Sequence, residues 1–169
     1  MDEGVFETTV TDGVLQARRP HTDWLSTGVD GGRQRADVAY NVTVPTGWEN
    51  TDLRAYIDRR VATAGFDADG PALLTGVAQR HARRASLDPV EAVVTAGLSN
   101  PATLPPGDAA DTSTPTPEAG DTGRNVDHDH HGTINIIVGT TRALPPAALA
   151  SLLAGVVEAK TATLSRRTG

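Results

Sequence analysis

The stretch from Gly132 to Leu164 constrains the fold most, because it joins a clear strand pattern to a clear amphipathic helix pattern. Residues 133–140 are rich in isoleucine and valine, which is typical of a buried strand. Pro145 and Pro146 then open the helix at a position where proline is tolerated. We therefore expect a strand that pairs into a sheet and is followed directly by a helix with one apolar side.

This predicted helix carries the one lysine of the chain, Lys160, among fifteen basic residues. The apolar stripe of the helix comprises Leu149, Leu152, Leu153, Val156 and Leu164. On a helical wheel of about 100° per residue, Lys160 falls within that stripe. A lysine in such a position either extends its ammonium group to water or meets a partner from elsewhere in the fold or from a ligand.

Composition excludes several classes of protein. The formal net charge is −6 with a sequence pI near 5.2, and no basic face is apparent, so nucleic acid is not an expected partner. The chain has no cysteine and therefore no disulfide or thiolate chemistry. Its acidic amino terminus is unlike a signal peptide, and no stretch approaches the roughly 18 apolar residues of a membrane span. We expect a soluble cytoplasmic protein of unknown oligomeric state, with no membrane partner.

The remaining elements follow from alternation and turn signals. Residues 5–19 predict a hairpin about Thr11-Asp12-Gly13, residues 28–32 a glycine-rich loop, and residues 38–44 a strand with one apolar face. A helix is expected over residues 51–64, with Thr51 as its N-cap and Gly65 as its stop. Residues 71–77 and 91–98 are compatible with buried strands, and the arginine-rich residues 79–86 with an exposed turn or short helix.

Residues 101–131 differ from the rest, since they contain five prolines and few large aliphatic side chains. We interpret them as a flexible insertion between two strands of a single domain covering residues 1–169. The predicted fold is α+β, a mixed or antiparallel sheet with two main helices packed on one face.

Two local clusters suggest sites. Residues 127–131 read Asp-His-Asp-His-His and could hold a metal, but a catalytic metal needs a rigid and supported pocket, so we expect no functional metal there. The loop from Ser26 to Gly32 could present hydroxyl and backbone N–H groups to a ligand, or could simply be a turn.

Five segments in order resemble the adenosylcobinamide amidohydrolase family. They are residues 24–28 with Gly31-Gly32, residues 40–41, residues 95–100, residues 132–137 and residues 158–161. The resemblance spans about residues 24–164, with residues 101–131 as a variable insertion. It implies hydrolysis of the amide that joins the corrin side chain to aminopropanol, releasing adenosylcobyric acid for cobalamin salvage. The corrinoid is then the substrate, and no cofactor is expected.

A corrinoid is a large, partly apolar disc rimmed with amides, so its site requires polar side chains around an apolar floor. We predict that Gly28, Gly31, Gly32, Asn41, Ser99, Asn100 and Asn135 bind substrate. We further hypothesise that the Ser26–Gly32 loop and Lys160 meet at one cleft. There Ser26 or Thr27 would act as nucleophile or orient water, and Lys160 would supply positive charge or a proton.

The family pattern continues past the last helix into a Thr/Gly-rich segment containing an aspartate, whereas this chain ends at Thr168-Gly169. A catalytically impaired corrinoid-binding domain is therefore the alternative function. A metal-binding domain centred on His128, His130 and His131 is a third hypothesis, which the need for a rigid site disfavours.

Overall fold

The computed structural model describes residues 4–45, 47–49, 52–97 and 133–168, and these form two β-sheets and two α-helices. The first sheet has the order β1 (Glu7–Thr11), β2 (Val14–Ser26), β3 (Gly32–Thr43) and β4 (Ala72–Thr75). Its β3–β4 pair is parallel and its other pairs are antiparallel. The second sheet is antiparallel, with the order β5 (Arg83–Leu87), β6 (Val90–Ala96) and β7 (Ile134–Thr140). The predicted α+β class is confirmed.

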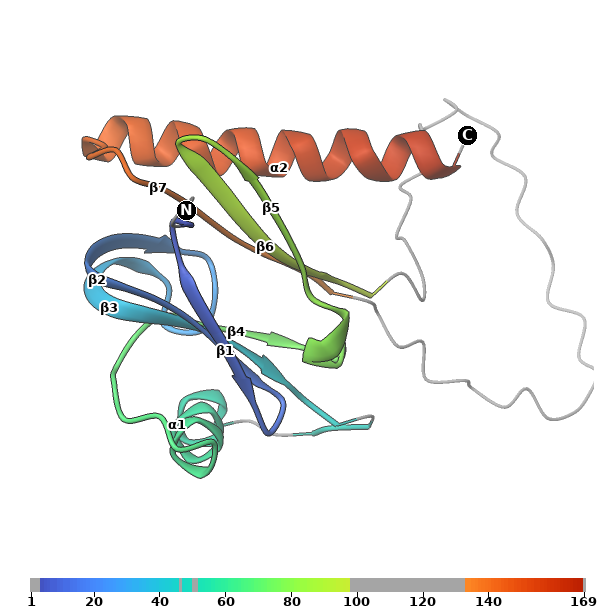
Figure 1. Ribbon diagram of the computed structural model, residues 1–169. Coiled ribbons are helices and arrows are strands. Elements are labelled where there is room, and N and C mark those ends of the chain that lie inside the picture. The colour runs from blue at the N-terminus through green and yellow to red at the C-terminus, as the bar shows by residue number, and fades with distance from the viewer. Residues whose placement is uncertain (1–3, 46, 50–51, 98–132, 169) are drawn as a thin grey trace, which may run out of the picture.

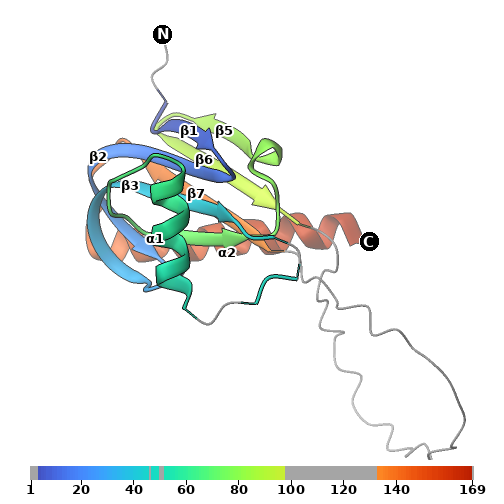
Figure 2. The same cartoon turned by 90° about the horizontal axis from the view of Figure 1, so that it is seen from below.

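The two helices lie on opposite sides of the molecule, not on one face of one sheet as the sequence led us to expect. In Figure 1, α1 (Leu53–Thr63) lies beyond the first sheet and α2 (Pro146–Thr168) beyond the second. The arrangement has a physical cause. Because the strands divide into two sheets that pack together, α1 covers the outer face of the first sheet, while α2 contacts β2 on the other side of the molecule. The turned view in Figure 2 shows the same separation of α1 from α2.

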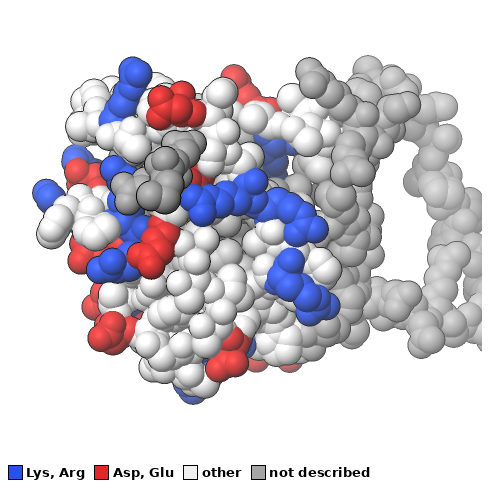
Figure 3. All heavy atoms as spheres, viewed as in Figure 1, with Lys and Arg blue, Asp and Glu red and all other residues white. Residues whose placement is uncertain are grey.

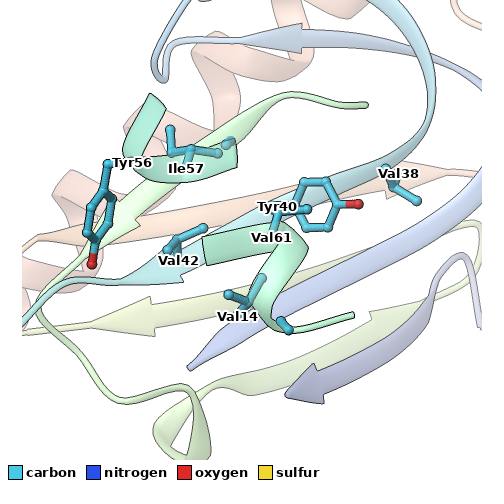
Figure 4. Close-up of a cluster of buried hydrophobic side chains, with 9 residues drawn as sticks. Val14, Val38, Tyr40, Val42, Tyr56, Ile57 and Val61 are labelled. Atoms are coloured by element: carbon cyan, nitrogen blue, oxygen red, sulfur yellow. The ribbon is translucent and has the colours of Figure 1, made fainter. Parts of the chain in front are cut away.

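One hydrophobic core lies between α1 and the first sheet. Alternate residues of β2 and β3 point to the helix, so Val14, Val38, Tyr40 and Val42 meet Tyr56, Ile57 and Val61 (Figure 4). The helix begins at an N-cap, Asp52, whose side chain accepts a hydrogen bond from the Ala55 N–H at 3.0 Å. Thr51, the predicted cap, lies outside the described residues.

The second core lies between the two sheets and uses the opposite face of β2 and β3. Leu15, Ala17 and Ala39 pack there with Phe6 and Trp24, and the second sheet contributes Val93 and Ile137. The rings of Phe6 and Trp24 stack with their centroids 5.8 Å apart. Successive residues of β3 therefore face α1 and the second sheet in alternation.

The segment before β1 is held in place by a buried carboxylate of the second sheet. Glu91, 1% exposed, accepts a hydrogen bond from the Val5 N–H at 2.8 Å. It also pairs with Arg84, with Nε 2.7 Å from Oε1 and Nη2 2.7 Å from Oε2. Since a buried charge is tolerated only with a charged or hydrogen-bonding partner, this cluster ties the amino-terminal segment firmly to β5 and β6.

Several expected boundaries need correction. The hairpin turn is confirmed, with positive φ at Asp12 and Gly13, but β2 continues to Ser26 instead of ending near residue 19. The arginine-rich segment forms a 3₁₀ turn, Gln79–His81, and then the strand β5, which was not predicted because all five of its residues are exposed and show no apolar alternation. The predicted insertion at 101–131 lies outside the described residues.

Helix α2 has no fully buried residue among those that the structure describes. Its predicted stripe is confirmed, since Leu149, Leu152, Leu153 and Val156 are half-buried while the residues between them are exposed. Its segment Pro146–Ser165 is also long and apolar enough, by length and composition, to cross a membrane. A single helix of this kind among the described residues is weak evidence for a membrane span. The expectation that no stretch has these properties is therefore wrong.

Candidate functional site

A cavity of about 400 Å³ lies where β2, β7 and α2 approach one another. Its apolar side is formed by α2 (Leu149, Leu152, Leu153 and Val156) and by the middle of β7. Its more polar side is formed by β2 from Arg19 to Ser26, together with Thr27 and the loop after β7, which includes Arg142. An apolar pocket with a few polar groups at its edge is the usual form of a site for a small organic ligand.

The Ser26–Gly32 loop contributes its first two residues to this cavity, and its role toward a substrate stays a prediction. Ser26 and Thr27 line it, and the Ser26 hydroxyl oxygen accepts a hydrogen bond from the Gly28 N–H at 3.0 Å. Gly28 itself approaches β4 closely, because a Cβ atom built on it would lie 2.2 Å from the Ala72 carbonyl oxygen. Glycine is therefore required there for backbone packing, which places the two hydroxyl residues at the cavity edge.

Asn41 and Asn135, both predicted to bind substrate, come together across the two sheets. The Asn135 side-chain Nδ2 donates to Asn41 Oδ1 at 2.8 Å and to the Leu74 carbonyl at 2.9 Å. Asn41 Nδ2 in turn donates to Thr95 Oγ1 at 2.9 Å and to Gln79 Oε1 at 3.4 Å. Neither asparagine lines the cavity. In the described structure their amide donors serve to join β3, β4, β6 and β7, and contact with substrate stays a prediction.

Lys160 lies on the same side of α2 as the cavity-lining residues, but beyond them. It is half-buried and one helical turn past Val156, the last α2 residue that lines the cavity. It forms no ion pair with any residue in the described part of the chain. The loop and α2 both line the cavity, but Lys160 does not, and the hypothesis that Lys160 meets the loop at one cleft stays a prediction. Ser99, Asn100 and the Asp127–His131 cluster lie outside the described residues.

Sequence reasoning missed the middle of β2, which forms much of the polar wall. The pairing of β2 with β3 shifts register between Arg18 and Thr22, and His21 within this bulge has a φ of 57°. The backbone N–H of His21 donates to Asp37 Oδ1 at 2.7 Å. Proline inside a strand marks an edge strand or a bulge, so Pro20 could have indicated this bulge from the sequence.

Tyr40 also borders the cavity, but its hydroxyl is directed elsewhere. The hydroxyl donates to the Ala68 carbonyl at 2.7 Å and accepts from Gln16 Nε2 at 3.2 Å. Burial is the main cause that raises the pKa of the Tyr40 phenol above its ordinary value of 10.0, with further contributions from Asp67 and Asp69 against a lowering by Gln16. The phenol therefore stays protonated at neutral pH.

The face of the molecule in the view of Figure 1 carries charges of both signs. On the face shown in Figure 3, basic side chains lie among acidic ones instead of forming one continuous basic surface. Together with the cavity between β2, β7 and α2, this defines an α+β protein with a pocket for a partly apolar small molecule.

Comparison with known proteins specifies the family. The family model described as adenosylcobinamide amidohydrolase matches residues 2–168. A protein of Halobacterium salinarum named adenosylcobinamide amidohydrolase is 47% identical over 167 residues, covering 98% of this chain and 68% of that protein. No solved structure was found to match. The chain belongs to the adenosylcobinamide amidohydrolase family.

Proposed function

We propose that this chain is an adenosylcobinamide amidohydrolase. It hydrolyses the amide between the corrin side chain and aminopropanol, and it releases adenosylcobyric acid for cobalamin salvage in the cytoplasm. The observation that carries the proposal is the match to the family across residues 2–168, together with 47% identity to a relative of that name. The same proposal requires no bound cofactor, because amide hydrolysis consumes only water.

The cavity suits such a substrate in its distribution of polarity. The leucine stripe of α2 and the aliphatic side chains of β7 offer an apolar surface to the corrin ring, while Ser26 and Thr27 offer hydroxyl groups to its amide rim. A cavity of about 400 Å³ that opens to solvent can enclose part of a large disc and leave the rest exposed.

The contacts of Ser26 favour an orienting role over a nucleophilic one. Its oxygen accepts from the Gly28 N–H, and no described histidine, carboxylate or lysine receives a hydrogen bond from its hydroxyl. A serine nucleophile needs an adjacent base to remove its proton. We therefore propose that Ser26 and Thr27 hold the substrate or a water molecule, and that Lys160 adds positive charge near the end of α2.

Incubation of the purified chain with adenosylcobinamide tests the proposal, with chromatography and mass spectrometry to detect adenosylcobyric acid and aminopropanol. We expect both products in equal amounts. Tight binding without products would instead support the corrinoid-binding alternative, and calorimetry that detects neither binding nor turnover would contradict both functions.

The first prediction concerns Ser26. Replacement by alanine removes one substrate hydrogen bond, so kcat/KM should fall about tenfold, equivalent to about 1.4 kcal/mol, and Lys160→Ala should lower it as well. Ser151→Ala is the matched control, since that hydroxyl is exposed on α2 and donates to the Ala147 carbonyl. Near-normal rates in both Ser26→Ala and Lys160→Ala would remove these residues from the site.

A further inference from the structure

The proposed reaction needs a group that can move a proton at the cavity, and Ser26 and Lys160 do not supply one. Five described residues with ionisable side chains line the cavity: Arg19, His21, Asp23, Tyr40 and Arg142. The present inference rests on the proposed function and asks which of these can accept and return a proton near neutral pH.

Four of the five are unsuited to this task. Arg19 and Arg142 stay protonated because guanidinium groups do not lose a proton in proteins, and Arg19 also donates to the Val5 carbonyl at 3.0 Å. Asp23 is paired with Arg33 across β2 and β3 at 3.5 Å. The Tyr40 phenol is turned to the Ala68 carbonyl, and burial raises its pKa. That leaves His21, whose imidazole ring has two nitrogens that can accept or donate a proton and which lines the cavity.

The backbone conformation of His21 belongs to the bulge in β2. Its positive φ of 57° is uncommon for a residue with a side chain, and such conformations persist only where the surroundings enforce them. Here the Asp37 carboxylate accepts the His21 N–H at 2.7 Å, and the same oxygen lies 3.8 Å from the ring Nδ1. The bulge turns a side chain that is 81% exposed to the rim of the cavity, where a ligand can reach it.

We propose that His21 is the general acid–base residue of amide hydrolysis, with Asp37 as the residue that positions it. In this step the imidazole accepts a proton from the water that adds to the amide carbon. The C–N bond then breaks as the same proton passes to the departing nitrogen, which leaves a carboxylic acid and an amine. His21 and Ser26 are five positions apart on β2, so about 16 Å of strand separates them. The two residues therefore serve different parts of one large substrate, and in this step Ser26 holds the substrate and not the reacting water.

The charged groups around His21 predict how the rate depends on pH. Asp37 on β3 faces the His21 ring, and Arg19 and Asp23 lie on either side of His21 along β2. Arg33 on β3 pairs with Asp23. Arg142 lines the cavity from the loop after β7, and the α2 residues that line it are all apolar. Imidazole must be unprotonated to accept the proton from water. The dependence of the rate on pH should therefore differ between the unmodified protein and a variant without His21.

The test uses the full chain and four substitutions, one of which is Asp37→Asn. His21→Asn keeps a residue that tolerates positive φ while removing the imidazole, and His21→Gly opens room at the same place. His81→Asn is the matched control, because His81 is an exposed histidine in the 3₁₀ turn and does not line the cavity. For each we would measure kcat and KM for adenosylcobinamide over a range of pH, its binding by calorimetry, and the effect of added imidazole.

We expect His21→Asn to lower kcat on the order of 100-fold or more with little change in binding. Added imidazole should restore part of the rate of His21→Gly but not of the control, a result that a merely structural role would not produce. Asp37→Asn should lower kcat less than loss of the imidazole does. If His21→Asn turns over like the unmodified protein at every pH, the role of His21 is overturned while the proposed function stands. If the unmodified protein itself shows no turnover, both are overturned.

Discussion

Asn41 is a buried polar residue whose side chain joins the two sheets through hydrogen bonds. It is 3% exposed, and its amide contacts Thr95, Gln79 and Asn135 through hydrogen bonds of 2.8 to 3.4 Å. Because it lies on the face of β3 that meets the second sheet, these contacts cross the boundary between the sheets. Buried polar groups destabilise the fold unless each has a hydrogen-bond partner, so this network of hydrogen bonds favours one alignment of the two sheets.

Replacing Asn41 by alanine should lower the free energy of unfolding by about 3 kcal/mol, because the change leaves buried partners without a hydrogen bond at about 1–3 kcal/mol each. Urea denaturation measures the change. Gln34→Ala, at an exposed position of the same strand, is the matched control and should have little effect. Equal stability of the two variants would show that the asparagine network does not hold the sheets together.

The raised pKa of Tyr40 predicts a loss of stability in alkali. The folded state disfavours the phenolate, so the contribution is fully present below the unfolded value of about 10 and is lost as the pH rises through the higher folded value. The free energy of unfolding of the unmodified protein should therefore fall more steeply above about pH 10 than that of Tyr40→Phe. Parallel curves from chemical denaturation across this range would contradict the assignment.

At the scale of elements, β2, β7 and α2 together make the cavity. The long strand β2 forms one arm of the hairpin, then contains the bulge at His21, and ends at Ser26, which lines the cavity together with Thr27. Helix α2 covers the cavity with a stripe that is only half-buried. A helix so placed acts as a wall of the site more than as a support of the two cores, neither of which includes any of its residues.

A charge placed on this wall should therefore weaken binding more than it harms folding. Leu152→Asp should reduce the affinity for adenosylcobinamide on the order of tenfold, since an unpaired carboxylate at an apolar surface opposes ligand burial. Val157→Asp is the control, because Val157 is 55% exposed on the same helix and does not line the cavity. Calorimetric titration gives both affinities, and equal values would mean that α2 does not contact the substrate.

At the scale of the whole molecule, most elements could be predicted from local pattern. The turn at Asp12-Gly13, the apolar face of β3, the helix α1 and the strand–helix pair at the carboxyl-terminal side all follow from periodicity and turn chemistry within short windows. The exposed strand β5 has no such pattern, and the length of β2 was concealed by Pro20 and the bulge. Ser26 and Thr27 line the cavity, while the catalytic role predicted for them stays a prediction.

The sequence by itself determined the α+β class, the inward stripe of α2 and the family, because each depends on residue order within segments. Tertiary structure decided that the strands form two sheets, that the helices lie on opposite sides, and that Asn41 meets Asn135. It also decided that His21 stands beside Asp37 at the rim of the cavity. These features depend on the pairing of strands far apart in the chain, and the energy of that pairing comes from packing and hydrogen bonds that no local pattern records.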